Sequence, residues 1–520
     1  MVKSYRIGID VGGTNTDAVL LDQDANILYS LKTPTTRDVS SGIYKALNDL
    51  LEGVDVDKDK IDYAMLGTTH CTNAIVERKG LNNIAIIRIG APATLAIKPL
   101  AGMPEGLKEV VGKHVYLVEG GHEFDGSQIA KLNEDRLYEI GEELKGKVDS
   151  VAITSVFSPV SKEHEIRAEE ILREVLGEDV HFSLSNEIGS IGLLERENAT
   201  ILNASVINVA KATSEGFVNA LKEKEIDAKV FFCQNDGTLM SIEYTVRYPI
   251  FTIACGPTNS LRGASYLGQK QNAITVDVGG TTTDLAILAN GFPRESSLAV
   301  EIGGVRTNFR MPDITSIGLG GGTIIHLNQE TGEYKIGPES VGYEIDTKAL
   351  VFGGDVLTAT DVAVAVTGVN VGDSSLVAHL DKGLMKSIYN SYTEMVETEI
   401  DKIKTSSDPV PVILVGGGSI ILPESLKGAA EVVKHENGGV ANAIGAAIAQ
   451  ASGQIEKVFS LDELGREQTI ELAKKMAIDE AISAGANPET IEIVNVEDVP
   501  LAYLPGSATK VTVKAAGNLL

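Results

Sequence analysis

Residues 7–21 read IGIDVGGTNTDAVLL, and residues 274–288 read ITVDVGGTTTDLAIL. Each stretch is an apolar run, a glycine-rich turn and a second apolar run, which predicts a strand, a turn and a strand. The two copies share Asp10 with Asp277, Gly12 and Gly13 with Gly279 and Gly280, and Asp17 with Asp284. Agreement at this density predicts an internal duplication.

The residue types in these turns suit a phosphate group. Glycines let the backbone approach a phosphate closely, successive N–H groups form an anion-binding concavity, and hydroxyls add donors. The aspartate of each turn can hold Mg²⁺ through water. One copy alone is equally typical of a glycine-rich β-turn with a solvated aspartate. Two copies in tandem favour the functional interpretation, in which one turn holds the β-phosphate and the other the γ-phosphate across a cleft.

Strand and helix patterns alternate around both hairpins, which predicts an α/β protein of several domains. Residues 198–222 are predicted to form one long helix that crosses into a second lobe, and the small-residue stretch 438–453 a helix suited to close packing. We expect an N-terminal lobe at 1–185, a second lobe at 186–455 and a small C-terminal α+β appendage at 456–520. The appendage should contain an amphipathic helix through Ala484 and two strands.

The net charge of −27 argues against a nucleic-acid surface, which needs clustered Lys and Arg. No stretch reaches the roughly 18 to 20 uninterrupted apolar residues of a membrane span. The cysteines, Cys71, Cys233 and Cys255, lie far apart and form no C-x-x-C pair, which argues against a disulfide framework or a local zinc site. We therefore expect a cytoplasmic protein that binds neither nucleic acid nor membrane.

Two further groups of residues leave their roles open. The triplet Gly416, Gly417 and Gly418 follows the strand VILV, and Gly320 to Gly322 lie in SIGLGGGTII. Each triplet fits either an ordinary strand turn or a contact with nucleotide or substrate. His70 and Cys71 lie where a strand meets a helix, a place that suits either a packed histidine with an inert buried thiol or a nucleophilic cysteine.

Beyond the hairpins, an ordered series of motifs runs through most of the chain: GTTHCTNAIVERKG, SNEIGSIGLLERENATILNA, ACGPTNSLRGASYLG, SIGLGGGTI, GGDVLTATDVAVAVTG and ANAIGAA. In this order they resemble the hydantoinase A/5-oxoprolinase family, the ATP-binding subunit type shared with acetone and acetophenone carboxylases. Many members of that family are longer, so the chain resembles a short form. The segment CQNDGTLM and the CTN at Cys71 depart from the family's usual residues, so substrate contacts are expected to differ.

The resemblance implies an α/β fold of two duplicated actin-like, ribonuclease H-like ATPase lobes, as in actin, hexokinase and acetate kinase, with ATP and Mg²⁺ between them. It implies that Asp10 and Asp277 are catalytic and are the Mg²⁺ carboxylates. It also implies an adenosine-facing turn and two phosphate-binding turns. These comprise Gly416, Gly417 and Gly418; Gly12, Gly13, Thr14, Asn15 and Thr16; and Gly279, Gly280, Thr281 and Thr282.

The activity implied by the resemblance is ATP-dependent hydrolysis of a cyclic amide such as a hydantoin, 5-oxoproline or another lactam or imide. Resonance makes the amide carbonyl a poor electrophile, and phosphorylation of its oxygen removes that protection before water attacks. A second, B-type subunit is expected to take part, and self-association is left open. The alternatives are an ATP-dependent carboxylase subunit, a nucleotide-sensing activator ATPase and a sugar kinase. The scattered cysteines disfavour an iron–sulfur activator, and the motif order disfavours a sugar kinase.

Overall fold

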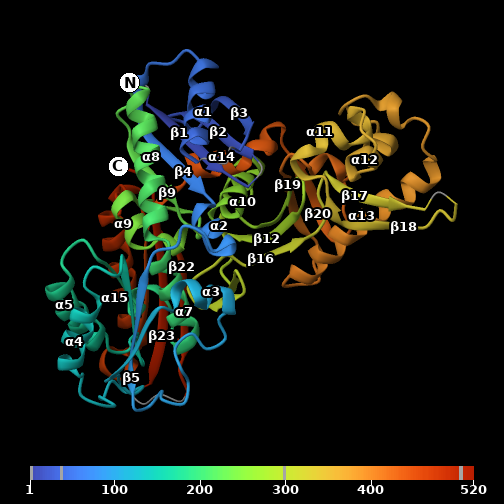
Figure 1. The fold of residues 1–520 in the computed structure, drawn as a ribbon. Helices are drawn as coiled ribbons and strands as arrows, with labels where there is room; N and C mark the ends of the chain where they lie inside the picture. The colour runs from blue at the N-terminus through green and yellow to red at the C-terminus, as the bar shows by residue number, and fades with distance from the viewer. Residues whose placement is uncertain (1–3, 14, 36–38, 297–299, 329, 503–506) are drawn as a thin grey trace.

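The computed structural model describes residues 4–13, 15–35, 39–296, 300–328, 330–502 and 507–520. Its largest sheet has nine strands in the order β22-β23-β21-β10-β9-β4-β1-β2-β3 (Figure 1). These strands are Tyr5–Val11 (β1), Asn15–Asp22 (β2), Ile27–Pro34 (β3), Ile61–Thr68 (β4), Lys229–Cys233 (β9), Thr238–Ser241 (β10), Gln450–Ser460 (β21), Glu492–Pro500 (β22) and Ala508–Gly517 (β23).

The first hairpin has a different environment on each of its two faces. Ile7, Ile9 and Val11 are buried in one core with residues of helices Val39–Glu52 (α1) and Ile207–Glu223 (α8). Since side chains alternate along a strand, Asp10 points to the opposite face. That face is covered by helices Cys255–Gly268 (α10) and Ala441–Ala447 (α14). The alternation therefore places a carboxylate between the sheet and two helices.

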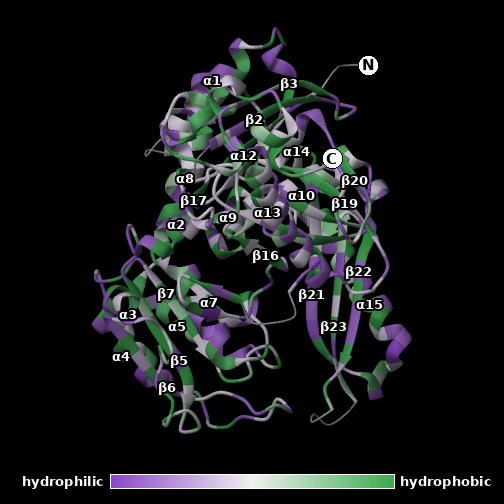
Figure 2. Cartoon of the chain, turned by 90° about the vertical axis from the view of Figure 1, so that its right-hand side faces the viewer, coloured by the Kyte–Doolittle hydropathy of each residue, from purple (hydrophilic) through white to green (hydrophobic). Residues whose placement is uncertain are grey.

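A four-stranded parallel sheet is inserted between β4 and β9, in the order β6-β5-β7-β8. In Figure 2 this sheet lies at the lower left, opposite β21, β22 and β23 at the lower right. The inserted region and its flanks contain Ile84–Ala91 (β5), His114–Glu119 (β6), Ser150–Ser155 (β7), His181–Leu184 (β8), His70–Glu77 (α2), Glu105–Val111 (α3), Glu134–Leu144 (α4), Glu163–Leu176 (α5), Ser185–Ile188 (α6), Leu193–Ser205 (α7) and Ile242–Arg247 (α9).

The second lobe, whose strands β17 to β20 lie on the right in Figure 1, repeats the core of the first. Its sheet order β13-β12-β11-β19-β20, in which β11 pairs with β12 antiparallel and with β19 parallel, matches β3-β2-β1-β4-β9. The predicted two duplicated actin-like lobes are therefore confirmed. The elements are Ala273–Val278 (β11), Thr283–Ala289 (β12), Phe292–Pro293 (β13), Val300–Ile302 (β14), Val305–Thr307 (β15), Ile314–Ile317 (β16), Thr323–Leu327 (β17), Tyr334–Ser340 (β18), Ile345–Lys348 (α11), Ala359–Thr367 (α12), Lys382–Ile403 (α13), Val410–Val415 (β19) and Ala429–Lys434 (β20).

The C-terminal residues form the predicted α+β unit. Helix Leu461–Ser483 (α15) packs against β21 and β23 through the alanines Ala473, Ala477 and Ala481. Strands β22 and β23 extend the nine-stranded sheet of the first lobe. The division into three domains stays a prediction. Within the described ranges, no helix combines the length and the apolar character that a bilayer crossing requires.

Two predicted helices differ from the observed ones. The helix expected at 198–222 is two helices, α7 and α8, because the backbone at Val206 leaves helical geometry (φ −115°, ψ 11°). The halves pack on different elements, α7 on β7 and α8 on α1. The helix expected at 438–453 shrinks to α14, because the residues from Gln450 onward pair as β21 with β10 and β23.

Candidate active site between the two lobes

The first hairpin carries two buried aspartates that lie directly opposite each other, Asp10 on β1 and Asp17 on β2. Asp10 accepts hydrogen bonds from Asn259 Nδ2 on α10 (2.9 Å) and from Asn442 Nδ2 on α14 (3.0 Å). Asn442 Nδ2 also donates to Asp17 (2.7 Å). The two helices that cover this face therefore hold the carboxylates of the hairpin in place.

The second hairpin repeats the arrangement, with Asp277 on β11 directly opposite Asp284 on β12. Ser260 of α10 donates a hydrogen bond to Asp277, and Ser316 of β16 donates one to Asp284. Asn259 and Ser260 are consecutive residues, so one turn of α10 contacts the first aspartate of both hairpins. The duplication seen in the sequence thus brings two equivalent carboxylates to the same helix.

The environment makes these carboxylates hard to ionise. The pKa of Asp10 is raised to about 6, because burial and the nearby charge of Asp17 outweigh the lowering effects of Asn259, Asn442 and Lys32. The pKa of Asp277 is also raised to about 6, because burial and the charges of Asp284 and Asp17 outweigh the Ser260 hydrogen bond and the charge of Lys32. Carboxyl groups whose pKa is strongly shifted by burial and by specific neighbours are candidates for a functional site.

Lys32 of β3 lies directly opposite Asp17, and its Nζ is 2.6 Å from Asp17 Oδ1. Asp10, Asp17 and Lys32 therefore form a line across three adjacent strands. The corresponding line in the second lobe is Asp277, Asp284 and Ser316. The two copies thus differ at the third position, where the first has a cation and the second a hydroxyl.

Three glycine-rich turns meet at the second hairpin. Gly418 N donates to Val278 O (2.7 Å), and Gly321 N and Gly322 N donate to Gly279 O (3.0 Å) and Gly280 O (2.8 Å). Gly416 has φ +84°, and a Cβ there would lie 2.3 Å from Asp277 Oδ1. Only glycine fits this close approach. The triplets at 320–322 and 416–418, whose roles the sequence leaves open, are therefore parts of the same site.

The other predicted site residues have varied surroundings. Gly12 N closes the first turn on Asn15 O (3.0 Å), and Gly279 N closes the second on Thr282 O (2.9 Å). Beside Gly13 and Gly417 there is open space. Thr16 is fully buried, and its hydroxyl is 3.1 Å from that of Thr35. Thr281 and Thr282 are exposed, and Thr14 lies outside the described residues. The phosphate contacts of these residues stay predictions.

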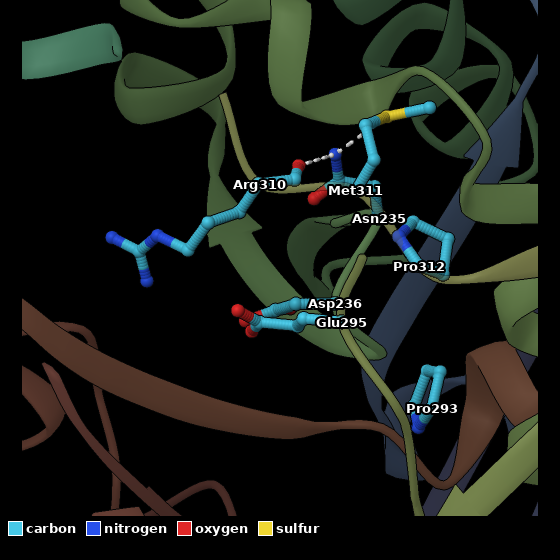
Figure 3. A pocket seen from close by; sticks show the side chains of 7 residues that line it. All are labelled: Asn235, Asp236, Pro293, Glu295, Arg310, Met311 and Pro312. Carbon is cyan, nitrogen blue, oxygen red and sulfur yellow. Dashed lines mark hydrogen bonds between the residues drawn. The ribbon is translucent and has the colours of Figure 1, made fainter. Parts of the chain in front are cut away.

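A strap from the second lobe crosses to the first. We use this name for residues 294–296 and 300–313, between β13 and β16. Asn198 Nδ2 donates to Arg306 O (2.9 Å), and Asn235 Nδ2 donates to Arg310 O (2.8 Å). Figure 3 shows the second contact, with the Arg310 side chain extending to the left of the view, the side toward which the carboxylates of Asp236 and Glu295 also point. The β9–β10 turn is thereby tied to the opposite lobe.

Cys71 is buried at the start of α2, and burial raises the pKa of its thiol to about 11. Burial raises the pKa of the Cys233 and Cys255 thiols as well. His70 bonds to the Thr68 hydroxyl through Nδ1. Since the thiolate is the reactive form, the surroundings of Cys71 favour the inert interpretation.

We expect all three cysteines of the native protein to resist alkylation at pH 8, because each thiol is buried and its pKa is raised. Intact-mass measurement after incubation with iodoacetamide should show no adduct, and three adducts once the protein is unfolded. A fast single adduct located on Cys71 would contradict the buried, inert assignment.

Sequence reasoning missed four of the residues that hold the aspartates, namely Lys32, Asn259, Ser260 and Asn442. Asn259 and Ser260 lie within the motif ACGPTNSLRGASYLG and Asn442 within ANAIGAA, so the motifs pointed to the right segments. What the motifs could not give is the contact between side chains that are far apart in sequence.

Comparisons with known proteins identify the family of the chain. Residues 6–176 match the family model described as hydantoinase/oxoprolinase N-terminal region, and residues 196–375 match the model described as hydantoinase/oxoprolinase. The chain is 26% identical over 386 residues to the caprolactamase subunit alpha of Pseudomonas jessenii, covering 70% of the chain and 54% of that protein. It is 25% identical over 386 residues to the acetone carboxylase beta subunit of Xanthobacter autotrophicus, covering 68% and 53%.

The crystal structure of the ATP-dependent caprolactamase from Pseudomonas jessenii superposes with a TM-score of 0.76 at 19% identity, covering 99% of this chain and 88% of that one. At this identity the likeness concerns the fold. The chain spans about half the length of both of these curated relatives.

Proposed function

Because the chain belongs to the hydantoinase/oxoprolinase family, we propose that it is an ATP-dependent hydrolase of a cyclic amide, such as a hydantoin, 5-oxoproline or another lactam or imide. The observation that carries the proposal is the pair of hairpins. Each presents an aspartate in the same register beside a glycine turn, Asp10 buried and Asp277 partly exposed, and one helix contacts both aspartates.

The residues at these turns fit a nucleotide with Mg²⁺. In the described ranges no group of three or more His, Cys, Asp or Glu side chains gathers as a metal-binding set. Mg²⁺ suits such a place, because it usually keeps several waters and takes one or two carboxylates plus phosphate oxygens. Asp10 and Asp277 would supply those carboxylates, directly or through water. The open space beside Gly13 and Gly417 leaves room for a ligand next to the backbone.

We assign the remaining roles by position. The backbone of Gly12 and Gly13, with Thr14, Asn15 and Thr16, would form one phosphate-binding turn. Gly279, Gly280, Thr281 and Thr282 would form the other, and Gly416, Gly417 and Gly418 would face the adenosine. ATP, when bound, would supply the phosphoryl group that activates the amide carbonyl, so that water can add to its carbon and the ring nitrogen can leave. The chain's own donors would neutralise the negative charge that develops there.

A partner protein is part of the proposal. The caprolactamase relative is a subunit by name, and this chain spans about half its length. We therefore propose that a second, B-type subunit completes the site at which water attacks the activated carbonyl.

The test is ATP turnover measured with a panel of hydantoins, 5-oxoproline and other lactams, with the chain alone and with an added B-type protein. We expect at least one cyclic amide to stimulate ATP hydrolysis and to be opened in equal amount. The Asp277→Asn variant serves as the inactive control. Substrate-independent hydrolysis at one unchanged rate across the whole panel would count against the proposal.

A carboxylase subunit is the second candidate, and the match to the acetone carboxylase beta subunit favours it. The same turns would then bind ATP for the phosphorylation of bicarbonate or of a ketone. ATP consumption that requires bicarbonate, with no opening of any cyclic amide, would decide for this alternative over the hydrolase.

A further inference from the structure

The two hairpins are copies, yet their surroundings differ in charge. Residues directly opposite each other on neighbouring strands lie on the same face of a sheet. Asp10, Asp17 and Lys32 therefore share one face of the first lobe. In the second lobe the residue that takes the place of Lys32 is Ser316. At this equivalent position the first hairpin therefore has a lysine neighbour and the second has a serine.

The site is otherwise acidic. The four carboxylates of Asp10, Asp17, Asp277 and Asp284 lie along the two hairpins. Their charges would repel the phosphates of a nucleotide, and a nearby cation would offset that repulsion. The charge of Lys32 acts on Asp10 in its own lobe and on Asp277 in the other. Lys32 therefore lies within electrostatic reach of both turns.

The Lys32 ammonium group is accessible from solvent. Its side chain is 38% exposed, while that of Asp17 is 3% exposed. Among the residues that the structure describes, Asp17 alone forms a salt bridge or hydrogen bond with Lys32 Nζ, at 2.6 and 2.9 Å to its two oxygens. An ammonium group has three donors, so Lys32 can keep Asp17 and still bind another acceptor.

We propose that Lys32 is a phosphate-binding residue of the first lobe, which holds the phosphate chain of the nucleotide together with the two glycine turns. This inference rests on the proposed nucleotide site. It gives the cation of the first hairpin a role that the Ser316 hydroxyl of the second copy does not share. Asp17 and Asn442 would orient the lysine rather than contact the ligand.

A purely structural role is the alternative. Lys32 could serve only to neutralise Asp17, whose burial is unfavourable without a partner. The two roles predict different behaviour when Asp17 is made neutral as well. A structural lysine becomes dispensable in Asp17→Asn, whereas a phosphate-binding lysine does not.

The experiment is isothermal titration calorimetry with a non-hydrolysable ATP analogue and Mg²⁺, with adenosine affinity measured by competition. The variants are Lys32→Ala, Lys32→Arg and the double variant Asp17→Asn/Lys32→Ala. We expect Lys32→Ala to lower the affinity for the analogue by about tenfold or more, because a charge-assisted hydrogen bond is lost. The affinity for adenosine should stay unchanged. Lys32→Arg should keep most of the affinity, and the double variant should stay as weak as Lys32→Ala.

Lys60→Ala is the matched control, because Lys60 is similarly exposed (40%) and pairs with Asp57 at 3.0 Å, just before β4 begins. It should bind the analogue as the wild type does. Wild-type affinity in Lys32→Ala, or recovery of affinity in the double variant, would overturn the assignment while leaving the nucleotide site intact. A wild-type protein that binds no adenine nucleotide would instead remove the proposed function and this inference with it. If Lys32→Ala does not fold, the double variant, which has no unpaired buried carboxylate at position 17, decides the question.

Discussion

Replacing Asp277 or Asp10 with asparagine is expected to lower ATP turnover by about 10³-fold, because either change removes a negative charge from the centre where Mg²⁺ and phosphate are proposed to bind. The effect should fall on the rate at saturating nucleotide and on Mg²⁺ dependence. Steady-state phosphate release at varied Mg²⁺ measures both. Wild-type rates in the two variants would refute the assignment of the twin hairpins as the site.

Because of the same two carboxylates, the rate of ATP turnover should fall at acidic pH. Both have pKa values of about 6, so each is mostly ionised at pH 7.5 and mostly protonated at pH 5. Protonation removes the metal-binding form, and activity should therefore fall as the pH drops through 6. A pH–rate profile that stays flat from 7.5 down to 5 would contradict this.

The stability of the chain without nucleotide should move in the opposite direction. A carboxyl group whose folded pKa is raised binds its proton more tightly in the folded state, so its contribution to stability falls as pH rises from about 4 to above 6. Asp277→Asn removes this penalty, and its unfolding free energy at pH 7 should rise by on the order of 1 to 2 kcal/mol.

Asp10→Asn should gain less stability than Asp277→Asn. In the wild type Asn259 and Asn442 each donate to one oxygen of Asp10, so the NH2 group of the new amide would face one of these two donors without an acceptor. Urea denaturation of both variants without nucleotide measures the difference. A loss of stability in Asp277→Asn would mean that its carboxylate is not penalised by burial.

The second large effect is expected from Gly445→Ala at the crossing of α10 and α14. A Cβ at this position would lie 1.8 Å from Asn259 O and 2.9 Å from Gly263 N, which are backbone atoms. The helices must separate to accept it, and overpacking of this kind costs about 3 kcal/mol. Because α10 carries Asn259 and α14 carries Asn442, the shift should also weaken the support of Asp10.

Thermal unfolding and nucleotide titration of Gly445→Ala test both consequences. The control is Gly439→Ala in the same segment, where a Cβ would meet no atom within 4 Å and should change little. Equal melting temperatures in the two variants would show that the helix crossing is not as tight as the structure has it.

The elements that follow from local pattern could be predicted from the sequence. The strand, turn and strand of both hairpins follow from the repeated apolar and glycine spacing, and the close packing of the stretch around Gly445 follows from its small residues. The contacts of Asn259, Ser260 and Asn442 could not be predicted, because they join residues that are distant in the chain. The bend at Val206 was also missed, since helical spacing continues through it and only the packing of α7 and α8 on different elements reveals the break.

The adjacency of Asn259 and Ser260 has a mechanical consequence. Neighbouring positions of one helical turn contact one hairpin each. A substitution that rotates or shifts that turn would therefore displace the supports of both carboxylates together, so a change on one side of the duplicated site is transmitted to the other.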